Sequence, residues 1–274
     1  MKISATSALV LNWTEKNNWR SKEAKEYNES LDLDEGASIL RLFSDKENYM
    51  HTQSVSNRKF FMRKCAVEFL EKNKSGQVVI LAAGIAPLSI ELAALFPEAK
   101  IFDVDKYLMI DKREDVEKLF KGSLQNIKFL ECDITEISSM EKLLSNNGWN
   151  KAEPTLLIME GITYYLRTED LEKILKYFAA FNSALACDFL LNYELIHETN
   201  RIYGIEVFRK IRETVGLEFV NSYSPDEFMK LVISSDFKNP ERQTMQDMQT
   251  ERTGKPEPYQ MPESGWITLV KSGI

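Results

Sequence analysis

Hydrophobic residues recur at helical spacing along the first 75 residues, which are otherwise polar and rich in Glu, Lys and Asn. Phe61, Cys65 and Phe69 are an example, because residues four apart share one face of a helix. This spacing predicts several helices and no strands in residues 1–75. The pattern changes at residues 75–76, after which a short, continuous apolar run follows.

From residue 77 onward, short apolar runs alternate with amphipathic runs. The short runs are typical of strands that are buried on both faces, and they cover residues 77–83, 100–105, 126–133, 155–161 and 184–192. Helical runs follow the first four of them, at residues 88–96, 107–122, 138–148 and 168–181, the last with Thr168 as its expected N-cap. This alternation predicts an α/β fold with a doubly wound, mostly parallel sheet and helices on both faces.

The remaining residues predict two helices, a loop and a last strand. The helices cover residues 195–216 and 224–235, the second with Ser224 as its N-cap. A Pro- and Gln-rich segment at 239–263 is expected to be a mobile loop, and residues 265–271 to be a strand. We therefore divide the chain into an N-terminal helical cap (1–75) and a sheet domain (76–274) with a helical insertion at about 193–235.

Composition narrows the classes of function. The 274 residues suit one large domain or two small ones. A net charge of −7, with Lys and Arg interleaved among Asp and Glu, disfavours nucleic acid as a partner. Three scattered cysteines and two histidines favour neither a disulfide framework nor a metal site. Without a signal-like segment or a bilayer-length apolar run, we expect a soluble, cytoplasmic protein that does not enter a membrane; its oligomeric state stays open.

Candidate ligand-binding residues stand where the predicted strands end. In open parallel sheets, ligands bind beyond the carboxyl ends of the strands. The first strand ends in Ala82-Ala83-Gly84-Ile85, and the next three end at Asp103 or Asp105, at Asp133, and at Glu160-Gly161. Each residue alone also allows a structural role, as a turn or a helix cap. Their ordered occurrence at consecutive strand ends favours a binding site, because buried carboxylates are costly without a partner.

The glycine pattern indicates which kind of nucleoside would bind. Asp105 lies 21 residues after Gly84, close to the spacing at which an acidic side chain reaches a ribose hydroxyl. The loop AAGIAPLS has a single glycine and a proline, and so lacks the glycines that a pyrophosphate needs. S-Adenosylmethionine has adenine and ribose but no phosphate, and its positive charges suit an acidic pocket. An NAD-dependent oxidoreductase stays a disfavoured alternative.

Four segments in order resemble the leucine carboxyl methyltransferase family of class I S-adenosylmethionine-dependent methyltransferases, which includes bacterial small-molecule O-methyltransferases. They are VVILAAGIAPLSIEL, FDVDKYLMIDK, FLECDIT and PTLLIMEGITYYL, and SNRKFFMRKCAVEFL upstream is similar to a family helix that carries an Arg. The resemblance covers roughly residues 55–180. It implies a seven-stranded, mostly parallel Rossmann-like sheet with a helical cap.

The resemblance also implies residue roles. It puts Gly84 against the methionine part of S-adenosylmethionine, Asp105 on the ribose, and Asp133 with Ile134 on the adenine. It assigns Glu160 to the ammonium group and Arg58 to the carboxylate, with Ala83 and Gly161 as further cofactor-binding residues. Tyr165 takes a catalytic position near the transferred methyl, and Lys112 matches a family lysine. No metal is implied.

The chain departs from the family pattern at Ala86-Pro87-Leu88, where an Asp and an Arg are usual. The departure is compatible with a changed cofactor grip, an unusual acceptor or weakened activity. The expected reaction is O-methylation of a small-molecule carboxylate, which is ionised at neutral pH with a pKa of about 4 and needs no general base. A hydroxyl acceptor would need one, with His197 as the candidate. A catalytically altered cofactor-binding protein is a further alternative.

Overall fold

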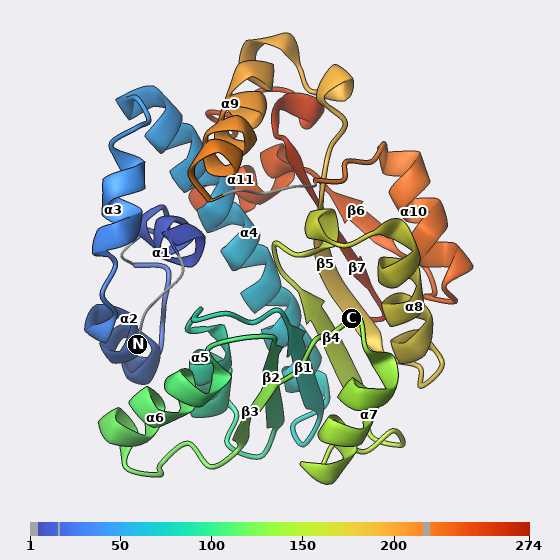
Figure 1. Cartoon of the computed structure of the whole chain (residues 1–274). Coiled ribbons are helices and arrows are strands. Elements are labelled where there is room, and N and C mark those ends of the chain that lie inside the picture. Colours follow the sequence, from blue (N-terminus) through green and yellow to red (C-terminus); the bar gives the residue numbers. More distant parts are fainter. Residues whose placement is uncertain (1–4, 16, 216–219) are drawn as a thin grey trace.

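A central sheet of seven strands organises the molecule, and the computed structural model describes residues 5–15, 17–215 and 220–274 (Figure 1). The strand order is β3-β2-β1-β4-β5-β7-β6. The strands are β1 (Gln77–Leu81), β2 (Lys100–Asp105), β3 (Ile127–Glu131), β4 (Thr155–Met159), β5 (Ala184–Leu190), β6 (Glu241–Gln243) and β7 (Ile267–Ser272). Strands β1 to β5 are parallel, and β7 runs antiparallel to β5 and β6. The predicted doubly wound, mostly parallel sheet is confirmed.

Helices surround this sheet. They are α1 (Ala5–Asn12), α2 (Lys22–Ser30), α3 (Asp34–Leu40), α4 (Asp45–Lys72), α5 (Leu88–Leu95), α6 (Met109–Phe120), α7 (Ile137–Asn146), α8 (Thr168–Ala179), α9 (Glu198–Val215), α10 (Pro225–Ser234) and α11 (Met245–Thr253). Short 3-10 turns lie at η1 (Thr163–Tyr165), η2 (Tyr193–Leu195) and η3 (Pro262–Ser264). Helix α5 packs on β2 and β3, whereas α7, α8 and α10 form a row on the other side of the sheet (Figure 1).

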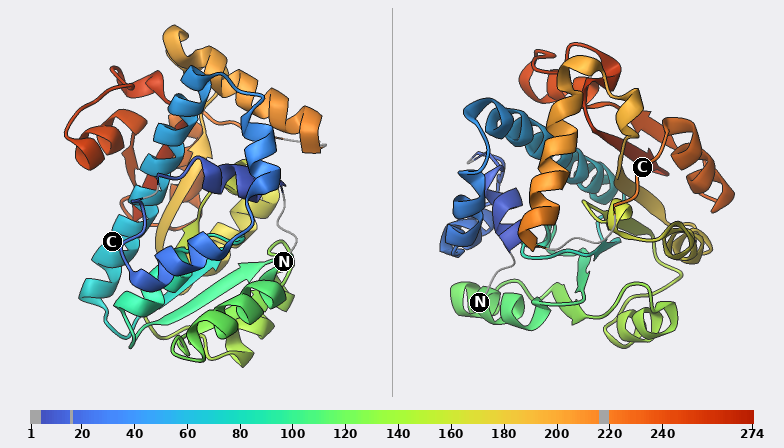
Figure 2. Two further views of the ribbon diagram at one scale, coloured as in Figure 1. Left: turned by 90° about the vertical axis from the view of Figure 1, so that its left-hand side faces the viewer. Right: turned by 45° about the horizontal axis from the view of Figure 1, so that its top comes forward.

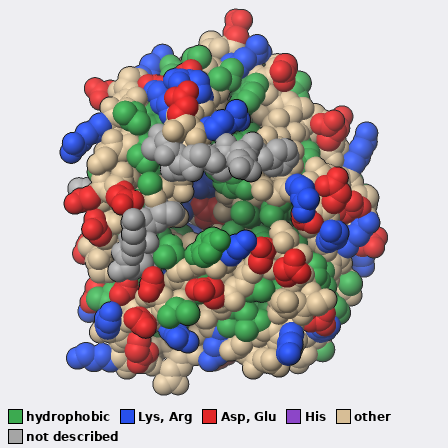
Figure 3. All heavy atoms as spheres, viewed as in Figure 1, with side chains coloured by type: hydrophobic (Ala, Val, Ile, Leu, Met, Phe, Trp, Pro, Cys, Tyr) green, Lys and Arg blue, Asp and Glu red, His purple; other side chains and the backbone are tan. Residues whose placement is uncertain are grey.

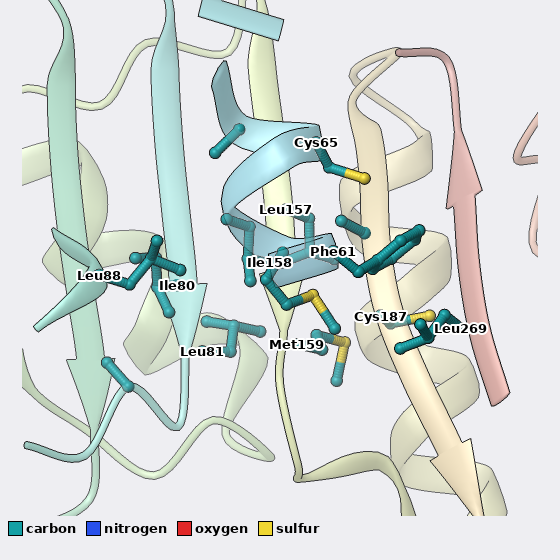
Figure 4. Close-up of a cluster of buried hydrophobic side chains, with 14 of the residues drawn as sticks. Phe61, Cys65, Ile80, Leu81, Leu88, Leu157, Ile158, Met159, Cys187 and Leu269 are labelled. Atoms are coloured by element: carbon teal, nitrogen blue, oxygen red, sulfur yellow. The ribbon is translucent and has the colours of Figure 1, made fainter. Parts of the chain in front are cut away.

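The long helix α4 joins the N-terminal helices to the sheet. It begins with a capping box, in which the side chains of Ser44 and Glu47 each bind the other's backbone N–H. Its middle lies against β4 and β5, where Phe61 and Cys65 meet Met159 and Cys187 in the core (Figure 4). The division predicted from the sequence counts this helix with the cap. Its packing fixes the position of its side chains relative to the ends of β1 and β4.

Helices α1, α3 and α9 lie near one another above the strands, whereas α2 lies lower, beside α5 (Figure 1, Figure 2). Helix α1 packs on α3 and also touches α9, and α2 packs on α5 and α6. The buried Glu91 of α5 accepts hydrogen bonds from the backbone N–H groups of Arg20 and Ser21, which fastens the segment before α2. Within the described part of the chain, no helix is long and apolar enough to cross a membrane.

Two expectations about the chain after residue 160 were wrong. The segment 239–263 is not a mobile loop, because it contains β6, α11 and η3. Helix α11 has a capping box of Thr244 and Asp247, and its Arg252 donates a 2.7 Å hydrogen bond to Asn57 on α4. These polar contacts leave no hydrophobic pattern in the sequence. Helix α8 begins at Thr168, so Arg167 is its N-cap, whereas the expected cap of α10, Ser224, is confirmed.

Candidate functional site

A cavity of about 680 Å³ opens at the carboxyl ends of β1 and β4, beneath helix α1. The space-filling view shows this face hollowed near its centre, with acidic and basic side chains at the base (Figure 3). The chain order reverses where β1 lies between β2 and β4, which is where an open α/β sheet binds its ligand. The cavity is lined by Thr6, Ser7, Val10, Leu11, Arg58, Lys59, Ile80, Ala82, Ala83, Gly84, Ile85, Ala86, Leu88, Ser89, Asp103, Glu160, Gly161, Tyr164 and Tyr165.

The loop after β1 forms one wall of the cavity. Gly84 has a φ of +51°, in the left-handed region that favours glycine. A Cβ added there would meet the Ser7 hydroxyl of α1 at 3.9 Å as its nearest neighbour, so the loop faces open space. Ala82 also has a positive φ, of +53°, which is strained for a residue with a side chain. The packing around the loop must therefore hold this conformation.

A buried lysine supports this loop from below. The ammonium of Lys112, on α6, donates to the carbonyl oxygens of Gly84 at 3.1 Å and Ala86 at 2.8 Å. It also donates to Asp103 Oδ2 at 2.7 Å, and both side chains are fully buried. The Ser89 hydroxyl gives Asp103 a further hydrogen bond at 2.6 Å, while the buried Asp103 Oδ1 accepts none from the described residues.

A second charged cluster forms the base of the cavity. Glu160, just after β4, accepts hydrogen bonds at its Oε1 from Arg58 Nε at 3.2 Å and from Lys59 Nζ at 3.0 Å. The Arg58 Nη1 group also donates to the Tyr164 hydroxyl at 3.2 Å. Burial by itself would raise the pKa of Glu160, but the two cations hold that pKa below its ordinary value. Glu160 is therefore an anion at neutral pH.

Asp188, near the end of β5, is a member of this cluster that sequence reasoning missed. Its Oδ1 accepts a 2.6 Å hydrogen bond from the backbone N–H of Gly161, and its Oδ2 lies 3.8 Å from Arg58 Nη1. Burial raises the pKa of this carboxyl to about 6. A single acidic residue inside the apolar run ALACDFL was the only available signal.

The structure brings six of the predicted site residues together as lining of the cavity: Arg58, Ala83, Gly84, Glu160, Gly161 and Tyr165. Lys112 acts from behind the lining through the carbonyls of the loop. Asp105, Asp133 and Ile134 lie outside the lining. Lys59 and Asp103 do line it, although the sequence analysis assigned no role to Lys59 and treated Asp103 as an alternative to Asp105.

The carboxylates that follow β2 and β3 have local partners. Asp105 accepts from the backbone N–H groups of Gly84 at 2.8 Å and Tyr107 at 3.2 Å, so it stands at the edge of the glycine loop. Asp133 forms a 2.9 Å ion pair with Lys106 and accepts from Thr135. The Thr135 and Lys106 hydrogen bonds lower the pKa of Asp133 to about 2. Both carboxylates therefore have hydrogen-bond donors among the described residues.

The residues present fit S-adenosylmethionine. The cavity volume is within the usual range for sites that bind cofactors and other small molecules. Its base offers both an anion and cations, as the ammonium and carboxylate of an amino acid require, and its glycine loop leaves space for close approach of a ligand. The buried Asp103 Oδ1 in the lining is a further acceptor without a partner among the described residues.

Comparisons with solved structures support the class of fold. A DUF574-family protein from Streptomyces avermitilis superposes with a TM-score of 0.62 at 13% identity, over 97% of this chain and 96% of that chain. A putative methyltransferase from Thermobifida fusca gives 0.62 at 13% identity, over 93% and 95%. The magnesium protoporphyrin IX methyltransferase from Synechocystis, with bound S-adenosylhomocysteine, gives 0.51 at 11%, over 90% and 96%. The fold is that of class I methyltransferases.

A comparison with protein-family models assigns the chain to one family within this fold class. A model of the leucine carboxyl methyltransferase family matches residues 21–179 of the chain. The chain therefore belongs to the leucine carboxyl methyltransferase family, whose cofactor is S-adenosylmethionine. A comparison with curated proteins finds no relative of this chain.

Proposed function

We propose that the protein transfers a methyl group from S-adenosylmethionine to a carboxylate oxygen of a small molecule. The observation that carries this proposal is the composition of the cavity wall: among the described residues that line it, none is a histidine or a cysteine. A carboxylate acceptor is already ionised at neutral pH and requires no proton transfer. The cavity then needs only to orient the two reactants and exclude water.

When bound, the cofactor would supply a methyl group on a positively charged sulfur. This sulfur is a good leaving group because it departs as a neutral thioether, in S-adenosylhomocysteine. In the proposed arrangement, the methionine part of the cofactor contacts Ala83, Gly84 and Gly161. Its ammonium binds Glu160, and its carboxylate binds Arg58. Asp105 binds the ribose hydroxyls, and Asp133 with Ile134 binds the adenine. Tyr165 packs beside the transferred methyl. The ion pairs of Glu160 with Arg58 and Lys59 support the contacts proposed for the methionine part. The position of Asp105 at the glycine loop supports the contact proposed for the ribose.

Methyl transfer to a hydroxyl is the second candidate reaction, and the positions of the possible bases disfavour it. His197 is not part of the cavity lining, and its Nδ1 is 3.0 Å from the Thr199 hydroxyl. Burial raises the pKa of Tyr165 to about 12, so its phenol stays protonated at neutral pH and cannot accept a proton. The two cations on Glu160 make that carboxylate a weak base as well.

Calorimetry and a product assay test the proposal together. We expect S-adenosylmethionine and S-adenosylhomocysteine to bind, and NAD not to bind. Asp105→Ala should raise the Kd of S-adenosylmethionine at least tenfold (~1.4 kcal/mol), whereas the exposed Asp32→Ala leaves it unchanged. With a methyl-labelled cofactor and a panel of carboxylic acids and matching alcohols, the label should enter base-labile esters.

Three results would contradict the proposal in different ways. Binding of NAD without S-adenosylmethionine would remove the cofactor assignment. Methylation of alcohols alone, with activity that is lost in His197→Ala, would establish the hydroxyl reaction. Cofactor binding without transfer to any acid or alcohol in the panel would favour a catalytically altered binding protein, as the departure at Ala86-Pro87-Leu88 allows.

A further inference from the structure

Two buried cations bind the same oxygen of Glu160 but have different neighbours. Arg58 faces the β5 side, where it contacts the Tyr164 hydroxyl and lies near Asp188. Lys59 faces the cap, where its ammonium lies 5.6 Å from the centre of the Trp19 ring. Burial lowers the pKa of Lys59, the charge of Glu160 raises it, and the positive charges of Arg58 and Lys112 lower it further. The side chain of Lys59 is 3% exposed and lines the cavity.

The charge on Lys59 requires an anion in every state of the site. A buried ammonium without a partner is strongly unfavourable. Its present partner is Glu160 Oε1, which it shares with Arg58, whereas Glu160 Oε2 accepts no hydrogen bond from the described residues. An incoming ammonium group would compete for Glu160. Lys59 then needs a second anion close by, on the side of the glycine loop.

The methionine part of the cofactor contains both groups on one carbon atom. If its ammonium binds Glu160, its carboxylate lies within a few bonds of the same place, between the helix that carries Lys59 and the loop at Gly84. The ligand ammonium would weaken the ion pair between Lys59 and Glu160, and the ligand carboxylate would give Lys59 a new partner. Each buried charge would therefore keep an opposite charge beside it. A ligand carboxylate held by Arg58 alone, on the β5 side, would leave Lys59 without an anion.

We propose that Lys59 is a second binding residue for the carboxylate of the cofactor and holds it from the glycine-loop side, while Arg58 holds it from the β5 side. This inference rests on the proposed function, since it requires S-adenosylmethionine in the cavity. A purely structural lysine, which only neutralises Glu160, would contact no ligand. If Lys59 binds the carboxylate, its substitution weakens the binding only of ligands that have a carboxylate. If Lys59 is purely structural, the change in ligand affinity does not depend on that group.

Decarboxylated S-adenosylmethionine separates the two roles, because it retains the sulfonium and the ammonium but lacks the carboxylate. Calorimetry on the whole protein should show that Lys59→Met raises the Kd of S-adenosylmethionine at least tenfold. The Kd of the decarboxylated compound should stay unchanged or fall, because the variant removes a repelling positive charge. Lys64→Met is the matched control, on the same helix but outside the cavity and paired with Glu251 at 2.6 Å; it should affect neither ligand.

The outcomes distinguish this inference from the proposed function. If Lys59→Met weakens both compounds equally, or weakens neither, Lys59 does not bind the carboxylate and the inference is wrong. If the wild-type protein binds neither compound, the proposed function fails and the inference with it. Thermal unfolding checks that the variant is folded. If Lys59→Met does not fold, Lys59→Gln is measured with the same two ligands and judged by the same ratio of Kd values.

Discussion

Buried charges at the cavity form two groups, and each constrains a different strand end. The first group is the ion pair of Lys112 and Asp103, which holds the loop after β1. The second lies after β4, where Glu160 pairs with Arg58 and Lys59, and Asp188 lies near Arg58. The first group explains how a loop without the usual Asp and Arg keeps its shape. The Lys112 ammonium donates to two loop carbonyls, so hydrogen bonds from this side chain to the backbone hold the segment that Ala86, Pro87 and Leu88 cannot hold with polar side chains.

Removal of the Lys112 ammonium should be strongly destabilising. Lys112→Met leaves Asp103 as a buried carboxylate without its cation, so we expect a loss of about 3–5 kcal/mol in the free energy of unfolding. Urea denaturation measures it, and the same variant should bind S-adenosylhomocysteine more weakly because the loop is freed. Lys100→Met, which breaks a half-exposed pair with Glu153, should cost less than about 1 kcal/mol.

A second substitution checks the reason for this effect. Lys112→Met combined with Asp103→Leu removes both charges, and it should recover a large part of the lost stability. If the double variant is as unstable as Lys112→Met alone, the loss comes from packing and not from an unpaired carboxylate.

The sequence located the site better than it located the partners within it. The strand ends point to Glu160, which lines the cavity, and to Asp105 and Asp133, which lie outside its lining, because the carboxyl ends of parallel strands must lie on one edge of the sheet. Lys59 and Asp188 could not be found in this way. Lys59 is one of many charged residues on a polar helix and Asp188 lies within a strand, so their roles depend on how α4 crosses β4 and β5.

At the scale of elements, hydrophobic periodicity predicted the five parallel strands and the helices between them. It missed β6 and α11, since α11 is held largely by polar contacts with α4, such as that between Arg252 and Asn57. It also could not show that α1 covers the cavity, because the position of α1 depends on its packing against α3 and α9, including one very close approach. Gly36 of α3 lies against the backbone of α1 at Ala8 and Leu9.

Substitution of this glycine should displace α1 from the cavity. A Cβ at Gly36 would lie 2.3 Å from the carbonyl carbon of Ala8, and neither backbone can yield without a shift of the helix. We expect Gly36→Ala to lower the free energy of unfolding by about 1–3 kcal/mol and to raise the Kd of S-adenosylhomocysteine at least threefold. Ser38→Ala, on the exposed face of α3, is the control and should change neither. Unchanged cofactor affinity in Gly36→Ala would show that α1 does not contribute to the site.

At the scale of the molecule, an aromatic cluster joins the N-terminal helices to the sheet. His51 of α4 has ring contacts with Trp13 after α1 at 4.7 Å, with Phe43 after α3 at 5.3 Å, and with Trp266 before β7 at 5.1 Å. Gly204 of α9 packs on the same Trp266. Four parts of the chain that are distant in sequence thus meet around one histidine, whose Nε2 has no hydrogen-bond partner among the described residues.

This cluster makes the stability of the whole protein depend on pH. Burial lowers the pKa of His51 to about 3, while Glu47 raises it and Lys210 lowers it by smaller amounts. The unfolded chain binds a proton at this residue near pH 6.5 and the folded chain does not, so the stability contribution is present above pH 6.5 and is lost as the pH falls toward 3. Between pH 7.5 and pH 5.5 this amounts to about 1.4 kcal/mol.

His51→Phe should remove this part of the pH dependence, because phenylalanine retains the ring contacts and cannot bind a proton. Urea denaturation at pH 7.5 and pH 5.5 gives the free energy of unfolding of each protein at both values. We expect the decrease on acidification to be smaller in His51→Phe than in the wild type by the same ~1.4 kcal/mol. His197→Phe, at the partly exposed second histidine, should retain the wild-type decrease. An equal decrease in His51→Phe and the wild type would mean that the cluster admits a protonated histidine, and that acid does not act on the junction between cap and sheet.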